Sequence, residues 1–239
     1  MKPAAFLRRK RGPILFLALA GGLAWGSARL LDPLYVPVSR VRVESHLDRL
    51  DTAEVKAALD PLLGRGFFAL DLERVRAAIQ ALPWVAEVRL RRVWPRTLVV
   101  RVRERRAFAR WGDAALVTAN GEVFQPRRAS IPHGLPRLDG PPGSAPLVVA
   151  AYQGLARRLA EKALRLTALQ RSPRGAWSAR LGDGTRIELG AEALEARLER
   201  LLNHLDAIRA GGRPARIDLR YAAGFAVAWH PPDPENHSQ

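Results

Sequence analysis

The chain has 239 residues, of which 48% are hydrophobic, and it contains no cysteine. This length suits one membrane anchor with one or two small domains, and the lack of thiols excludes disulfide bonds and thiolate metal sites. The net charge of +16 makes nucleic acid and anionic membrane surfaces the partner classes to consider first.

Five of the positive charges lie within the first twelve residues, which contain no acidic residue. Residues 14–28 carry no charge, and a helix over 14–31 would be roughly 27 Å long, close to the thickness of a hydrocarbon core. The positive-inside rule then predicts a cytoplasmic basic tail at 1–12, a transmembrane helix at 13–31 and an extracytoplasmic remainder. A cleaved signal peptide with Gly26-Ser27-Ala28 at its cleavage site is the alternative interpretation.

The segment 35–106 shows the patterns of a strand, two helices and two more strands. Alternating polarity and capping aspartates predict strands at 38–45, 84–93 and 98–104, and helices at 51–63 and 71–82. Two helices can cover one face of such a sheet, which leaves four arginines on the other face: Arg89, Arg91, Arg101 and Arg103. This row is either solvated charge or a basic docking surface.

The segment 107–230 predicts a second domain of mixed strands and helices. Asn120-Gly121 is typical of a hairpin turn within 115–124, and the Pro- and Gly-rich residues 126–146 indicate a loop. The remaining patterns predict helices at 147–164 and 192–208, and strands at 166–170, 176–181, 185–189, 215–221 and 224–229. The polar tail 231–239 is expected to be disordered. The fold class is therefore α+β.

No catalytic or cofactor-binding motif is present. The sequence contains no phosphate loop, GxGxxG, HExxH or GxSxG, and its five histidines show no metal-ligand spacing. The acidic pair Asp48 and Asp51 stands beside a helix start, where capping accounts for it. We therefore expect a binding protein that needs no cofactor, metal or small-molecule substrate.

The last two predicted strands are the candidate binding site. A chain-terminal strand is often a sheet edge with unpaired backbone groups, which can accept an extended segment of a partner. Tyr221, Phe225 and Trp229 lie on this strand pair, and their periodicity fits a core role and an interface role equally.

Two stretches resemble a known family. The run LPWVAEVRLRRVWPRTLVVRVRERRAFARW at 82–111 resembles the POTRA domain of the FtsQ/DivIB cell-division family, and IDLRYAAGFAVAW at 217–229 is similar to that family's ending. With the basic tail and single span, the resemblance covers residues 1–230. It implies a POTRA domain at 35–106 and an FtsQ-type β domain, built on an antiparallel sheet, at 107–230. It also implies a single-pass inner-membrane protein at the division septum, with its bulk in the periplasm.

The resemblance implies a scaffold of the divisome that links early and late division proteins and binds the FtsB/FtsL complex. By position, it assigns the FtsB contact to Arg220, Tyr221, Gly224 and Trp229, beside Phe225, and adds Arg174 as a further contact. It also implies that the POTRA domain serves recruitment to the septum, for which its arginine face is the candidate surface. Ala222-Ala223 stand where relatives often have polar residues, so a side-chain hydrogen bond is not expected there.

Two other classes compete with this interpretation. A POTRA-containing component of protein transport or outer-membrane assembly would carry repeated POTRA units or a row of barrel strands, whereas this sequence shows one unit and no such row. A membrane-tethered nucleic-acid binder would need its basic surface in the cytoplasm, opposite to the predicted orientation.

Overall fold

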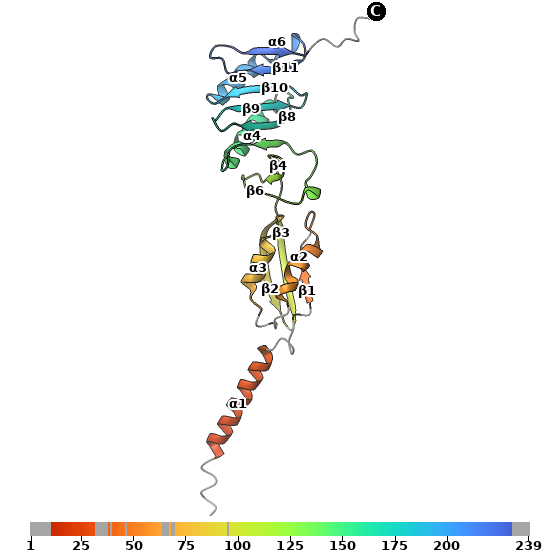
Figure 1. The fold of residues 1–239 in the computed structure, drawn as a ribbon, viewed down its shortest axis with the longest axis vertical. Helices are drawn as coiled ribbons and strands as arrows, with labels where there is room; N and C mark the ends of the chain where they lie inside the picture. Colours follow the sequence, from red (N-terminus) through yellow and green to blue (C-terminus); the bar gives the residue numbers. More distant parts are fainter. Residues whose placement is uncertain are drawn as a thin grey trace, which may run out of the picture. The chain divides into compact units, whose positions relative to one another are not determined.

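The computed structural model describes residues 11–31, 38, 40–45, 47–63, 67, 70–94 and 96–230 (Figure 1). Most of the predicted basic tail and all of the predicted disordered tail lie outside these residues. The chain divides into two compact units, Met1–Arg105 and Arg106–Gln239.

The first helix, α1, spans Arg11–Leu31 and covers the segment predicted as a transmembrane helix. Its exposed large side chains are apolar: Phe16, Leu17, Leu19, Leu23 and Trp25. The Arg29 guanidinium lies 4.8 Å from the centroid of the Trp25 ring. Within the described part of the chain, no helix combines the length and the apolarity that crossing a membrane requires. The helix is therefore confirmed, and its crossing of a membrane is not.

A three-stranded sheet with two helices forms the rest of the first unit. The sheet order is β1-β3-β2, with β1 parallel to β3 and β2 antiparallel to it. The elements are β1 (Arg40–Val43), α2 (Thr52–Leu59), η1 (Asp60–Leu62), α3 (Leu72–Gln80), β2 (Val85–Val93) and β3 (Thr97–Glu104). The predicted β-α-α-β-β order is thus confirmed, because the two helices form the long connection that parallel strands need.

The predicted helix starts are confirmed and one helix end is not. Asp51 accepts a hydrogen bond from the Ala53 amide at 2.9 Å, and Asp71 accepts one from the Glu73 amide at 3.0 Å. The α-helix after Asp51 ends at Leu59 and continues as the short 3₁₀ helix η1 instead of reaching Leu63. Pro61 lies inside η1, and its missing N–H removes one bond of a continuing α-helix.

Glu104 joins the end of β3 to the loop before α2. Its carboxylate accepts hydrogen bonds from the backbone amides of Asp48 at 3.1 Å, Arg49 at 3.1 Å and Leu50 at 2.7 Å. Sequence patterns did not indicate this contact, because its partners lie more than fifty residues apart along the chain.

The second unit is built on one nine-stranded sheet, in the order β12-β11-β10-β9-β8-β7-β4-β5-β6. Its strands are β4 (Ala109–Trp111), β5 (Ala115–Val117), β6 (Val123–Phe124), β7 (Arg137–Asp139), β8 (Leu166–Arg171), β9 (Trp177–Leu181), β10 (Arg186–Gly190), β11 (Pro214–Asp218) and β12 (Ala226–Trp229). Its helices are η2 (Arg128–Ser130), α4 (Ala145–Ala160), α5 (Leu194–Asn203) and α6 (Leu205–Ala210). The hairpin β5-β6 forms as predicted, with Gly121 at φ +84° in its turn.

This sheet is mixed, so the prediction of an antiparallel sheet was wrong. Three neighbouring pairs are parallel: β4 with β7, β7 with β8, and β10 with β11. Helix α4 connects β7 to β8, and α5 with α6 connect β10 to β11, as crossovers between parallel neighbours. Strand β7 lies inside the segment predicted to be a loop, where three residues between prolines and glycines carry no clear alternation.

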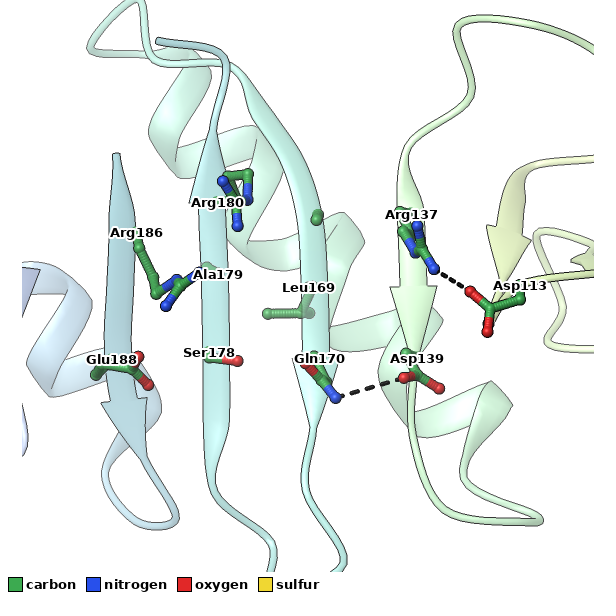
Figure 2. A pocket seen from close by; sticks show the side chains of 12 residues that line it. Asp113, Arg137, Asp139, Leu169, Gln170, Ser178, Ala179, Arg180, Arg186 and Glu188 are labelled. Carbon is green, nitrogen blue, oxygen red and sulfur yellow. Dashed lines mark hydrogen bonds and ion pairs between the residues drawn. The ribbon is translucent and has the colours of Figure 1, made fainter. Parts of the chain in front are cut away.

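Helices α4 and α5 cover one face of the large sheet. Their buried residues Val148, Leu159 and Leu201 join a core with Leu169 of β8 and Ile187 of β10. The predicted helix 192–208 is divided at His204, whose φ of −110° and ψ of 9° interrupt the helical backbone between α5 and α6. The opposite face of the sheet carries charged side chains, and Figure 2 shows it with the helices behind the strands.

Candidate partner-binding edge

Strand β12 lies at one end of the nine-stranded sheet, as predicted for a chain-terminal strand. It pairs antiparallel with β11, and Val227 stands opposite Ile217 while Ala228 stands opposite Arg216. Among the described residues no further strand lies beyond β12, so its outer edge presents backbone groups that the sheet leaves unpaired. This edge is the geometric requirement for adding a strand from a partner.

The connection between β11 and β12 is held by Arg200 of α5. Its guanidinium donates hydrogen bonds to the carbonyl oxygens of Tyr221 at 2.9 Å, Ala222 at 2.9 Å and Gly224 at 3.1 Å. The two strands are shorter than predicted, since β11 ends at Asp218 and β12 begins only at Ala226. The Leu219 amide still bonds the Glu188 carbonyl of β10 at 2.9 Å, and the backbone leaves the sheet after it. Sequence reasoning missed Arg200, which is one of several arginines in an amphipathic helix and carries no distinguishing local signal.

The three aromatic residues of the edge have different surroundings. Phe225 is half-buried, packs against the core and makes an edge-to-face contact with His204 at 5.5 Å between ring centroids. Tyr221 is 59% exposed and Trp229 is 42% exposed. The sequence fitted a core role and an interface role equally, and the structure shows both kinds of surroundings. Phe225 contributes to the core, whereas Tyr221 and Trp229 face solvent.

Trp229 lies against the glycine turn that follows α6. A β-carbon placed on Gly211 would lie 2.7 Å from Cη2 of the indole, so only glycine leaves room for the ring in this position. Gly212 adopts φ +118°, which side chains rarely allow. The turn thus fixes one face of the indole and leaves part of the ring exposed for contact.

Arg220 forms an ion pair with Asp218. Its Nε lies 2.9 Å from Oδ1 and its Nη2 lies 2.6 Å from Oδ2 of Asp218. The hydrogen bond from Arg220 lowers the pKa of Asp218 below its ordinary value, although burial acts in the opposite direction. The same bond raises the pKa of Arg220. A partner would therefore contact an Arg220 guanidinium that is already ion-paired with Asp218.

Two of the predicted contact residues, Arg174 and Arg220, lie near the carboxyl-terminal end of β10. The turn that holds Arg174 leads into β9 beside the end of β10, since Trp177 pairs with Gly190. The Cγ atom of Arg220 would lie 3.3 Å from a β-carbon on Gly190, so Arg220 lies beside the same strand ends. Arg174 is exposed there, and Trp229 lies at the other end of β12, opposite Pro214. Their contact with a partner stays a prediction.

The arginine face of the first unit forms, with acidic residues interspersed. Arg89 stands directly opposite Arg101, and Arg103 stands opposite Glu87. Glu87 accepts hydrogen bonds from Arg89 at 2.8 Å and Arg103 at 3.2 Å, which lower its pKa. Glu44 of the neighbouring loop bonds Arg101 at 3.1 Å. The face, which also includes the exposed Arg91, is thus partly neutralised, and recruitment through it stays a prediction.

Two further features of the described residues concern metal and ligand binding. Among them, no three His, Asp or Glu side chains gather in an arrangement that could hold a metal ion. A hollow lies on the open face of the second unit's sheet, away from the helices.

Comparison with known proteins identifies the family. Residues 36–105 match the model of the FtsQ-type POTRA domain, and residues 109–220 match the model of the FtsQ/DivIB C-terminal domain. The second match ends at Arg220, so Tyr221 to Trp229 lie beyond it.

Relatives named cell division protein FtsQ match nearly the whole chain. The protein of Allochromatium vinosum is 38% identical over 218 residues, which are 91% of this chain and 88% of the relative. The protein of Coxiella burnetii is 33% identical over 218 residues, 90% of each chain. That of Shewanella oneidensis is 35% identical over 202 residues, 84% of this chain and 77% of the relative. With identities at this level over both of its units, the chain belongs to the FtsQ family of cell division proteins.

Proposed function

We propose that this protein is a divisome scaffold that acts by binding other division proteins, and that the outer edge of β12 binds an extended segment of FtsB. The observation that supports this most directly is the position of β12 at the end of the sheet, with exposed Tyr221 and Trp229 at either end of the strand region. FtsL would reach the chain through its complex with FtsB. Family membership weighs against the alternative of a component of transport or outer-membrane assembly.

The short edge needs side-chain anchors as well as backbone pairing. Strand β12 has four residues, and each added backbone hydrogen bond contributes only about 0.5–1.5 kcal/mol net. Truncating an aromatic anchor at the centre of an interface can cost about 2 kcal/mol or more. Tyr221 and Trp229 therefore supply specificity in this proposal, and Arg200 and Gly211 keep them in position before the partner arrives.

The test measures binding of the full chain to the periplasmic segment of FtsB from the same organism. We expect Tyr221→Ala and Trp229→Ala to weaken binding about tenfold or more, equivalent to about 1.4 kcal/mol. Trp94→Ala is the matched control, because Trp94 is 76% exposed in the first unit and should leave affinity unchanged. Circular dichroism checks that each variant is folded. Equal affinity for all four proteins, or no binding by the unaltered chain, would refute the proposed edge.

We also propose that α1 anchors the chain in the inner membrane, with the N-terminus in the cytoplasm. The support is the uncharged run of residues 14–28 and the exposed apolar side chains of α1. Against it stands the finding that no helix of the described residues is long and apolar enough to cross a membrane. The chain should stay in the membrane fraction after alkaline carbonate extraction, and protease added outside spheroplasts should digest residues 40–230. The variant Leu19→Arg/Leu23→Arg should be released from the membrane fraction by the same carbonate treatment. Extraction of the unaltered chain would disprove anchoring.

A further inference from the structure

The open face of the second unit's sheet contains a hollow of about 870 Å³ that the binding edge does not use (Figure 2). It extends over β7, β8, β9 and β10, on the side opposite α4 and α5. The strands beneath it are paired on both sides, so a ligand in the hollow meets side chains and no free sheet edge.

The charged side chains of the hollow form two rows across the strands. In one row, Arg186 stands opposite Arg180, and Ala168 then separates Arg180 from Arg137. Two residues away on each strand, the other row contains Glu188, Ser178, Gln170 and Asp139. Figure 2 shows Arg186, Arg180 and Arg137 on one side of the hollow and Glu188, Ser178, Gln170 and Asp139 on the other, with Asp113 beside Arg137. The rows are about 7 Å apart along the strands.

Most of these charges already have partners within the chain, and two do not. Arg137 forms an ion pair with Asp113, and Asp139 accepts a hydrogen bond from the Gly140 amide at 2.8 Å. Glu188 lies 3.6 Å from Arg216 of β11. Among the described residues, Arg180 and Arg186 have no carboxylate within ion-pair distance. Like charges directly opposite each other on neighbouring strands are destabilising, so this pair favours an incoming anion.

We propose that this hollow binds an α-helical segment of a protein partner, with acidic side chains along one flank and basic side chains along the other. The acidic flank meets Arg137, Arg180 and Arg186, and the basic flank meets Glu188 and Asp139. Arg180 and Arg186 are one strand apart, about 4.8 Å, and Arg137 is two strands beyond Arg180, about 10 Å. Acidic residues at i, i+3 and i+10 of a helix lie at about 0, 4.5 and 15 Å along its axis, which matches this spacing.

Two other occupants fit the hollow less well. An extended segment lying across the strands would leave its backbone amides and carbonyls without sheet partners, whereas a helix satisfies its own. A second copy of the chain would present an equivalent hollow, and two concave faces leave a gap between the rows that should pair. A helix is convex and about 10–12 Å wide with its side chains, so it can enter.

The test uses the full chain and a lactam-stapled alanine-based helix that carries glutamates at i, i+3 and i+10 and lysines on the opposite flank. A scrambled peptide of the same composition controls for attraction to a cationic protein. We expect the helix to bind at least about tenfold tighter than the scrambled peptide, because only its charges match the rows. The variant Arg180→Glu/Arg186→Glu should lose this preference, and a peptide with lysines in place of the glutamates should recover binding to that variant.

Arg128→Glu/Arg157→Glu is the matched control, since both arginines are exposed outside the hollow and their reversal changes the net charge equally. It should retain the preference for the helix. Equal binding of helix and scrambled peptide, or unchanged binding by Arg180→Glu/Arg186→Glu, would overturn the proposal. A shift from dimer to monomer in sedimentation on reversing Arg180 and Arg186 would assign the hollow to a second copy and overturn it too. FtsB binding by the same variants should be unchanged, which separates this surface from the β12 edge.

Discussion

Asp218 and Arg220 form their ion pair at the point where β11 leaves the sheet. Besides the side-chain contacts, the Arg220 amide donates to Oδ1 of Asp218 at 3.1 Å, so one carboxylate both pairs the charge and caps the strand end. Arg216 contributes a weaker attraction at 3.8 Å. The pair orients Arg220 next to Tyr221, and its strength should depend on pH because only the carboxylate titrates in the acid range.

We expect Arg220→Ala to lower the free energy of unfolding at neutral pH and to have less effect in acid. The bound carboxylate has a pKa below the ordinary aspartate value of 3.8, so its stabilising contribution is present above that pH and is lost as the pH falls through the lowered pKa. Urea unfolding of both proteins at about pH 6 and about pH 3 measures the difference. Arg157→Ala, at an exposed helical position, is the control. A difference that stays constant or grows in acid would contradict this account.

At the scale of elements, α5 and the last strand pair act together through Arg200. A single guanidinium satisfies three carbonyls that would otherwise point to solvent near a sheet edge. Helix α5 therefore supports the core through Leu198 and Leu201 on one side and the candidate binding loop through Arg200 on another.

We expect Arg200→Ala to lower stability by about 1 kcal/mol, because hydrogen bonds exchanged for water contribute modestly, and to increase amide exchange at residues 221–226. Affinity for the FtsB segment should fall with Tyr221 and Trp229 unaltered, since the loop must then be ordered on binding. Arg200→Lys keeps the charge but cannot reach three carbonyls, so it should resemble Arg200→Ala. Full affinity in both variants would show that the loop is ordered without Arg200.

The sequence predicted those elements whose causes are local. Asp51 and Asp71 cap helices, Asn120-Gly121 turns a hairpin, and the alternation in 84–104 gives the β2-β3 pair. The sequence-based prediction was wrong where an element depends on tertiary contacts. Strand β7 forms because it pairs with β4 and β8 on either side, and the parallel pairs arise because helices connect them as crossovers. The edge position of β12 could be predicted from its place at the chain end. Arg200, Glu104 and the arginine row of the hollow could not, because each is defined by partners distant in sequence.

At the scale of the whole molecule, part of the excess of basic over acidic residues has a structural explanation. Several guanidinium groups donate to backbone carbonyls: Arg197 to Leu189 at 2.6 Å, Arg105 to Pro83 at 2.5 Å, and Arg92 to Leu70. Lysine, with a single ammonium group, would not replace these planar donors. A net charge of +16 therefore does not by itself indicate nucleic acid, and the surfaces that matter for binding are those where the charge is unpaired.

Salt should distinguish the two proposed surfaces of the second unit. At the β12 edge, backbone pairing and aromatic burial dominate and Arg220 is already neutralised by Asp218, so affinity for the FtsB segment should fall less than about threefold between about 0.05 and 0.5 M NaCl. In the hollow, Arg180 and Arg186 are exposed and without acidic partners among the described residues, so affinity for the stapled helix should fall about tenfold or more over the same range. Isothermal titration of one protein preparation with both peptides provides the comparison. Equal salt slopes would mean that the edge also binds through charge, and Arg174 would then be the first residue to substitute.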